Sequence, residues 1–267
     1  MSKYLKSELE EFTPIQFIPP TRNEFFSTLC SQIFSLPKPI IYYISKNPST
    51  SKVYQKMIRT CKYFFFQNPI LIVKYISLDT FSDTYPNYSS KLWITDNFSV
   101  FLPYQNDFEA FLPKIFKCNA KTLTLNFLSL NFEDFKMLSN SAVSIDLSHS
   151  TIIKYKNGKD VELEKLIEVC PNVKIFNYEL SPTICSTKTV KNLVKIPHFQ
   201  FMRKFELSNI PESFEIQKIL AFRKKKTNMR VEFYFCNELS EKYRCLLNFL
   251  EIKETFLGST GLSSIRY

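Results

Sequence analysis

The most constraining feature of this chain is a short motif that recurs in its second half, in which one polar residue separates two apolar ones. The copies are Leu123-Thr124-Leu125, Ile145-Asp146-Leu147, Val173-Lys174-Ile175, Phe205-Glu206-Leu207 and Val231-Glu232-Phe233. Their first residues are separated by 22, 28, 32 and 26 residues. Because alternate residues of a strand point to opposite faces, each copy predicts a short strand with one buried face.

A helix-like segment precedes each of these motifs. The candidates are 108–116, 132–138, 163–169, 187–195 and 214–225. In the third, Leu163, Leu166 and Ile167 fall at i, i+3 and i+4, so one face of the helix is apolar. A single unit cannot cover its own apolar face, and we therefore expect the units to stack side by side, with a parallel sheet inside and helices outside.

The spacing of the units lies near the period of about 20–29 residues of leucine-rich repeats. The predicted fold class is therefore α/β, with an irregular leucine-rich-repeat-like arc over 108–256. We expect a last helix over 240–254 to cover the open end of the stack and a frayed tail over 257–267.

The segment from Leu36 to Ile76 carries three helical signatures. Pro37 opens the first, which ends at Asn47-Pro48 because the residue before a proline is pushed out of the helical region. Ser49 to Ser51 offer caps for a second, whose apolar stripe is Val53, Met57, Cys61, Phe64 and Phe65. The third follows Asn68-Pro69 and runs over the apolar residues 70–76. We expect a module over 31–78, preceded by a poorly ordered leader over 1–30 and followed by a connector over 79–107.

Several enzyme chemistries are excluded by composition. The chain has only three glycines, at 158, 258 and 261, so neither a phosphate-binding loop nor a dinucleotide fingerprint can be drawn. It has two histidines, and neither H-x-x-x-H nor C-x-x-C spacing occurs, so no metal site is expected. His149 follows Asp146 and Ser148, but no G-x-S-x-G motif accompanies them, and we read it as a loop residue. We expect no catalytic residue and no cofactor.

Charge and cysteine content bear on compartment and partners. Seven cysteines at irregular separations favour reduced thiols, and hence a cytoplasmic or nuclear protein. The most apolar stretch, 63–78, is interrupted by Gln67, Asn68, Pro69 and Lys74, so no membrane span is expected. The net charge is +10, and its one dense basic run lies between Arg223 and Arg230. That run is typical of a solvated helix end, and the alternative is a nucleic-acid-binding patch.

Residues 36–66 resemble the F-box, the three-helix module by which substrate receptors dock onto the Skp-type adaptor of cullin-RING ubiquitin ligases. The resemblance is carried by Leu36-Pro37, by Ile40, Ile41 and Ile44, and by Met57-Ile58-x-x-Cys61-Lys62-x-Phe64. With leucine-rich-like repeats behind it, the chain is similar to the large nematode F-box-like families.

This resemblance implies a non-catalytic substrate receptor. The adaptor would bind Leu36, Pro37, Ile40, Ile41, Ile44, Val53, Met57, Cys61 and Phe64, and an unknown protein substrate would bind the strand positions Thr124, Asp146, Lys174, Glu206 and Glu232. Lys38-Pro39 and Lys52-Val53 depart from the family's pattern. A repeat scaffold whose F-box has lost its partner is therefore a further alternative.

Overall fold

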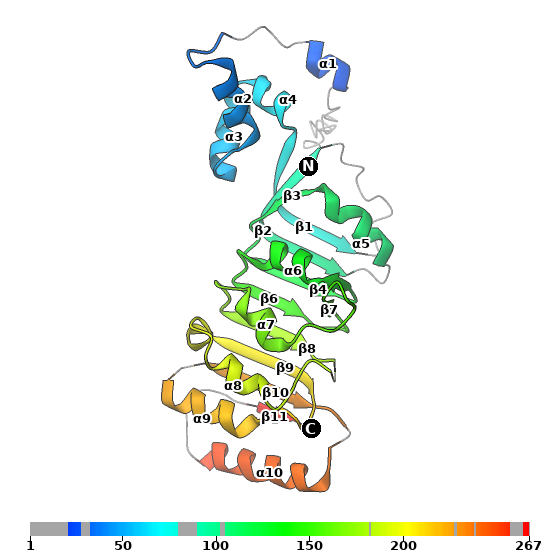
Figure 1. Cartoon of the computed structure of the whole chain (residues 1–267), viewed down its shortest axis with the longest axis vertical. Coiled ribbons are helices and arrows are strands. Elements are labelled where there is room, and N and C mark those ends of the chain that lie inside the picture. Colours follow the sequence, from blue (N-terminus) through cyan, green and yellow to red (C-terminus); the bar gives the residue numbers. More distant parts are fainter. Residues whose placement is uncertain are drawn as a thin grey trace, which may run out of the picture.

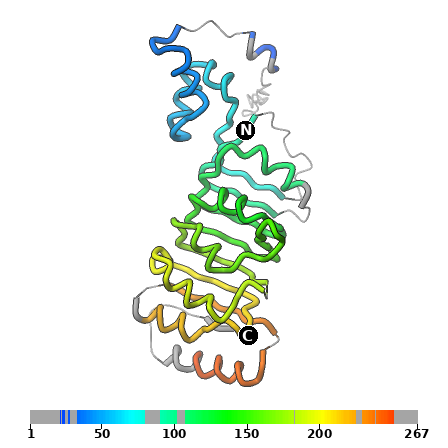
Figure 2. The backbone as a smooth tube through the Cα atoms, in the orientation of Figure 1, coloured from blue at the N-terminus to red at the C-terminus, as the bar shows by residue number. Residues whose placement is uncertain are grey.

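The described part of the chain forms one long parallel sheet with helices along one face. The computed structural model describes residues 21–27, 33–79, 90–101, 105–181, 183–226, 229–237, 239–256 and 264–266. Within these residues the main sheet is nine-stranded, in the order β1-β2-β4-β6-β8-β9-β10-β11, and β3 pairs with β2. Figure 1 shows α6, α7, α8 and α9 on the same face of this sheet, and Figure 2 shows the chain running once along the stack.

From β4 onward, the strands of the main sheet alternate with helices in chain order. The sheet contains β1 (Ile70–Asp79), β2 (Lys91–Phe101), β3 (Ile115–Cys118), β4 (Thr122–Asn126), β6 (Ser144–Leu147), β8 (Ile175–Glu179), β9 (Lys204–Ile210), β10 (Arg230–Phe235) and β11 (Ser264–Arg266). A second sheet pairs β5 (Ser129–Asn131) with β7 (Ile152–Lys154). The helices of this part are α5 (Gln105–Phe111), α6 (Phe132–Ser139), α7 (Leu163–Glu168), α8 (Thr189–Leu193), α9 (Ile216–Lys226) and α10 (Glu241–Phe256), with 3-10 turns η1 (Leu112–Lys114) and η2 (Phe199–Phe201).

The N-terminal helices form a module at one end of the stack. The module consists of α2 (Lys38–Lys46), α3 (Ser51–Thr60) and α4 (Lys62–Gln67), and α1 (Arg22–Ser27) precedes it in the chain. Thr21 accepts a hydrogen bond from the backbone N–H of Glu24 and so begins α1, and Thr50 does the same for Val53 at the start of α3. The leader predicted over 1–30 lies largely outside the described residues, which there are 21–27.

The predicted α/β class and its parallel sheet are confirmed, because the alternation of apolar residues matches the observed burial. Leu123 and Leu125 in β4, and Phe205 and Leu207 in β9, are completely buried, whereas the residues between them are partly exposed. These apolar side chains meet those of α6 to α9 in one continuous core. The helix predicted over 240–254 is also present, as α10.

The helix predicted over 70–76 is wrong, because these residues form β1. β1 pairs in parallel with β2, from Ile70 opposite Lys91 to Asp79 opposite Phe101. A short apolar run does not distinguish a buried strand from a buried helix by periodicity, and the branched side chains of Ile70, Ile72 and Val73 favour the strand. The sheet thus begins inside the predicted module, and β2 and the start of α5 lie within the predicted connector.

Three smaller predictions are also corrected. The stripe from Val53 to Phe65 is not one helix, because Cys61 is extended (φ −152°, ψ 126°) and separates α3 from α4. The third repeat strand starts at Ile175, two residues later than its motif indicates. In the predicted tail, Ser264–Arg266 pair with β10 as β11.

Candidate protein-interaction surfaces

The N-terminal module attaches to the sheet through a buried tyrosine of α3. Tyr54 is completely buried and packs with Ile70 of β1 and Trp93 of β2 in a cluster separate from the main core. Its hydroxyl donates to the backbone oxygen of Asn68 and accepts from the backbone N–H of Ile70 at 3.3 Å. Burial raises the pKa of this hydroxyl, which therefore stays protonated and able to donate.

This attachment is on the sheet face opposite α6 to α9. Leu92 and Ile94 of β2 belong to the main core, and Trp93 between them must point to the other face. The indole of Trp93 donates to the side-chain oxygen of Asn119 at 2.7 Å, and the ammonium of Lys117 lies 5.2 Å from its ring centre. The module therefore covers the open face only at the first strands.

Within the module, α2 packs through one buried side. Ile41 is 6% exposed, and the buried Ser45 hydroxyl donates to the backbone oxygen of Ile41 at 2.6 Å. The side-chain amide of Asn68 donates to the backbone oxygen of Ser45 at 3.1 Å. Contacts of α4 with both α2 and α3 complete the bundle.

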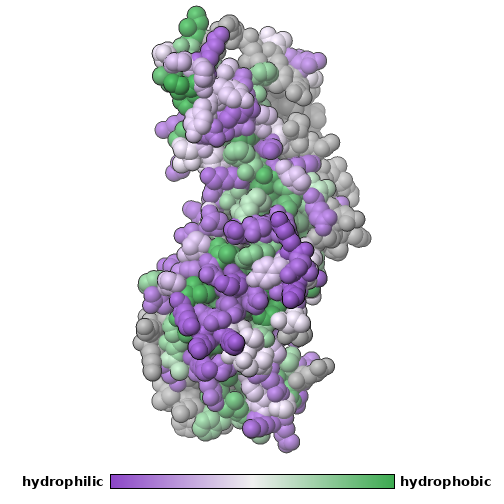
Figure 3. All heavy atoms as spheres, in the orientation of Figure 1, coloured by the Kyte–Doolittle hydropathy of each residue, from purple (hydrophilic) through white to green (hydrophobic). Residues whose placement is uncertain are grey.

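The nine residues predicted to bind the adaptor divide by exposure. Leu36, Pro37, Ile40 and Val53 are exposed; Ile44, Met57, Cys61 and Phe64 are half-buried; and Ile41 is buried. The exposed fractions of Leu36, Ile40 and Val53 are 46%, 46% and 42%, which is high for aliphatic side chains. Figure 3 shows hydrophobic atoms gathered at the tip of the module. The module therefore has both a small core and an apolar surface.

The second surface is the open face of the sheet, where β4, β6, β8, β9 and β10 place one residue each in a single row. In the observed register Thr124 lies opposite Asp146, Asp146 opposite Asn177, Asn177 opposite Glu206, and Glu206 opposite Glu232. Four of the five residues predicted to bind substrate therefore share one row.

The fifth prediction, Lys174, is not in this row. It lies in the turn before β8, where its ammonium is 5.5 Å from the ring centre of Phe201. Asn177 occupies the position in the row that was predicted for Lys174. Sequence reasoning missed Asn177 because the strand motif was placed at Val173. The buried pair Phe176 and Tyr178 repeats the same apolar spacing and is the signal that could have found it.

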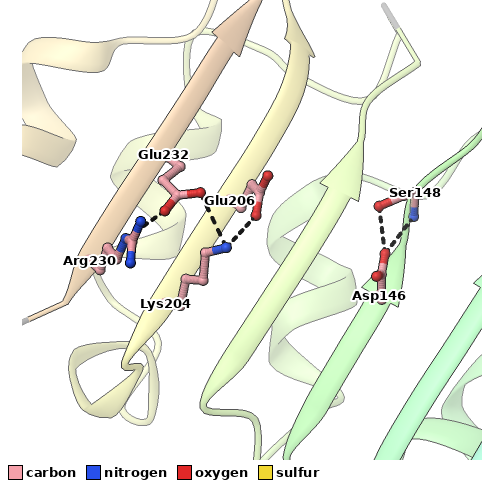
Figure 4. A network of polar contacts seen from close by, with 6 residues as sticks. All are labelled: Asp146, Ser148, Lys204, Glu206, Arg230 and Glu232. Carbon is pink, nitrogen blue, oxygen red and sulfur yellow. Dashed lines mark hydrogen bonds and ion pairs between the residues drawn. The ribbon is translucent and has the colours of Figure 1, made fainter. Parts of the chain in front are cut away.

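An ion-pair network crosses the last strands of this face (Figure 4). The ammonium of Lys204 lies 2.7 Å from a carboxylate oxygen of Glu206 and 3.2 Å from one of Glu232. Arg230 contacts the other oxygen of Glu232 at 2.5 Å. Burial opposes the charge of Lys204, but hydrogen bonds to the two carboxylates outweigh it, so the pKa of Lys204 is raised. The network neutralises this end of the row.

The middle of the row carries an acid, Asp146, that pairs with neutral donors among the described residues. One oxygen of Asp146 accepts from the backbone N–H of Ser148 at 3.0 Å and from its hydroxyl at 2.5 Å (Figure 4). In the next strand, Glu179 accepts from the backbone N–H of Ser150 at 3.0 Å. Both carboxylates are oriented by the turn after β6, in which His149 and Ser150 have positive φ.

The basic run between Arg223 and Arg230 does not form a uniform patch among the residues whose side chains are described. Arg223 is 7% exposed, and Arg230 is engaged by Glu232. Burial and pairing leave these two guanidinium groups poorly placed for phosphate.

The described residues contain neither a metal-binding cluster nor a membrane-spanning helix. No group of three or more histidine, cysteine, aspartate or glutamate side chains there could hold a metal ion. Among the helices in the same part of the chain, none has the length and apolar character needed to cross a membrane.

No protein-family model matches the chain, and no curated protein matches it either.

Proposed function

We propose that this chain is the non-catalytic substrate-recognition subunit of an SCF-type cullin-RING ubiquitin ligase. In this proposal α2 to α4 form an F-box-like module that docks a Skp-type adaptor, and the strands form a leucine-rich-repeat-like arc that binds a protein substrate on its open face. The observation that carries the proposal is the exposed apolar surface of Leu36, Ile40 and Val53 on helices that join the sheet through a small cluster separate from the main core.

The physical argument is that exposed aliphatic groups on a small helical module are stabilised by a partner. Burying a Leu, Ile or Val side chain is favourable by about 1.5–3 kcal/mol, and contiguous exposed apolar surface marks an interaction site. Ile41, which the F-box resemblance also places at the adaptor, belongs in this proposal to the module's own core. The reduced state expected of the cysteines supports a cytoplasmic or nuclear location, and the described ones are free thiols.

Binding of a purified Skp-type adaptor tests the proposal. We expect the wild-type chain to co-elute with the adaptor, and Ile40→Asp or Val53→Asp to weaken binding at least about tenfold, because each places a charge in an apolar contact. Met137→Asp is the matched control, since Met137 is 38% exposed on α6, outside the module. Equal recovery of the adaptor by all variants, or no recovery by the wild type, would contradict docking and leave a repeat scaffold without an adaptor.

A further inference from the structure

A pocket of about 450 Å³ opens between α7 and α8, on the helical side of the sheet. This side is away from the open sheet face and from the N-terminal module, and Figure 3 shows mostly hydrophilic residues over these two helices. The polar residues that line the pocket are Glu164, Lys165, Glu168, Asn192, Lys195 and His198. The volume falls within the range of about 300–1,000 Å³ that is usual for ligand sites.

Glu164 supplies a buried carboxylate oxygen that no described residue pairs with. Its side chain is 8% exposed, and one oxygen accepts from the side-chain amide of Asn192 at 2.9 Å. The other oxygen is buried and has no hydrogen-bond partner among the described residues. A buried charged oxygen left in this state is costly, and a ligand with N–H donors and positive charge would remove that cost.

The lysines of the pocket do not meet this need. The ammonium of Lys165 pairs with Glu168 at 2.7 Å, and within the described residues no ion pair joins Lys195 to Glu164. A metal ion is also a poor fit, because the pocket residues do not form a metal-binding group of three His, Cys, Asp or Glu. The ligand that best complements this pocket is therefore an organic cation.

His198 offers a further acceptor. Its Nε2 lies 2.8 Å from the backbone oxygen of Ile167, which can only accept, so Nε2 carries the proton. In the neutral ring Nδ1 is then an acceptor. His198 and Glu164 both line the pocket, beside the apolar residues Ile196 and Pro197.

We propose that this pocket binds a guanidinium group, with Glu164 as its counter-charge. A guanidinium has five N–H donors in a plane and is more weakly hydrated than an ammonium, so it is suited to a half-enclosed site with several acceptors. Its source is either an arginine side chain of another protein or a small guanidinium compound. The proposal does not depend on the receptor function, because neither the module nor the open sheet face contributes to it.

Titration with ethylguanidinium, followed by NMR of the Asn192 side-chain amide and the His198 ring, tests this site. We expect saturable binding with a dissociation constant on the order of 1 mM, and no binding of ethylurea, which has a similar shape without the charge. Glu164→Gln should weaken binding at least about tenfold. Glu133→Gln, on the exposed first turn of α6, should leave it unchanged.

Two further probes distinguish the sources of the group. Tighter binding of a blocked Gly-Arg-Gly peptide than of free arginine indicates a protein side chain, and the reverse order indicates a small molecule. Equal binding of ethylguanidinium and ethylurea by the wild type, or no shift at Asn192 and His198, would overturn the proposal. This comparison needs no variant, so it stands even if Glu164→Gln does not fold.

Discussion

At the scale of single residues, Tyr54 is the most consequential side chain of the N-terminal module. Its ring fills the small cluster with Ile70 and Trp93, and its hydroxyl serves two backbone groups at the start of β1. One side chain thus links the third helix to the first strand.

Tyr54→Phe should lower the free energy of unfolding by about 1–3 kcal/mol, because the backbone oxygen of Asn68 and the backbone N–H of Ile70 each lose their hydrogen bond to the Tyr54 hydroxyl. Thermal and urea unfolding measure this loss. Tyr43→Phe is the control, since Tyr43 is 67% exposed, and it should change little. Equal effects of the two substitutions would show that the Tyr54 hydroxyl does not stabilise the attachment.

The cysteines are distinguished by burial. Desolvation raises the pKa of Cys118 to about 11 and those of Cys170 and Cys185 to about 12, whereas Cys245 is exposed. We expect maleimide at pH 8 to label Cys245 in the native protein and to spare the three buried thiols, as read by peptide mass spectrometry.

The same raised pKa values predict how stability changes with pH. The unfolded thiols ionise near pH 9 and the folded ones only above it, so their contribution to stability is fully present below pH 9. It is lost as the pH rises from 9 toward 12. Rapid native labelling of Cys170, or stability that increases over this range, would contradict the packing described for these residues.

At the scale of elements, the ion-pair network joins β9 to β10. The side chain of Glu232 is 8% exposed and lies between Lys204 and Arg230. Glu232→Gln should therefore lower the free energy of unfolding by about 1–3 kcal/mol, measured by urea denaturation. The exposed pair of Glu133 and Lys136 is the matched control, and Glu133→Gln should cost under about 1 kcal/mol. A cost for Glu232→Gln no larger than for this control would show that the network does not stabilise the sheet.

Most repeat strands could be predicted from sequence because one local pattern determines them. The motifs beginning at Leu123, Ile145, Phe205 and Val231 each lie within an observed strand. β1 could not be predicted in this way, because the periodicity of an unbroken apolar run does not distinguish a strand from a helix. The row on the open face could be identified only from the strand register. Because β8 starts at Ile175, Asn177 and not Lys174 lies in the row.

The contact of Tyr54 with Trp93 could not be predicted from sequence, for another reason. It joins residues far apart in sequence and depends on how α3 crosses the sheet. The pocket at Glu164 likewise depends on the packing of α7 against α8, which no local pattern encodes.

At the scale of the whole molecule, the sheet runs from β1 to β11, and its last strand pairs with β10 along only a few residues. Truncation after Phe256 removes β11 and exposes the edge of β10. Because unpaired edges invite association, we expect lower stability and concentration-dependent self-association, measured by light scattering. A truncated chain that remains monomeric and equally stable would show that β11 does not protect this edge.

The proposed function requires the N-terminal module and the strands β4 to β10 to be separate binding surfaces, one for an adaptor and one for a substrate. Amide hydrogen exchange with and without a saturating Skp-type adaptor tests it most directly. We expect the adaptor to add protection from exchange over residues 36–66 and to leave exchange over β4 to β10 unchanged. Protection centred on those strands, or no change anywhere along the chain, would contradict it.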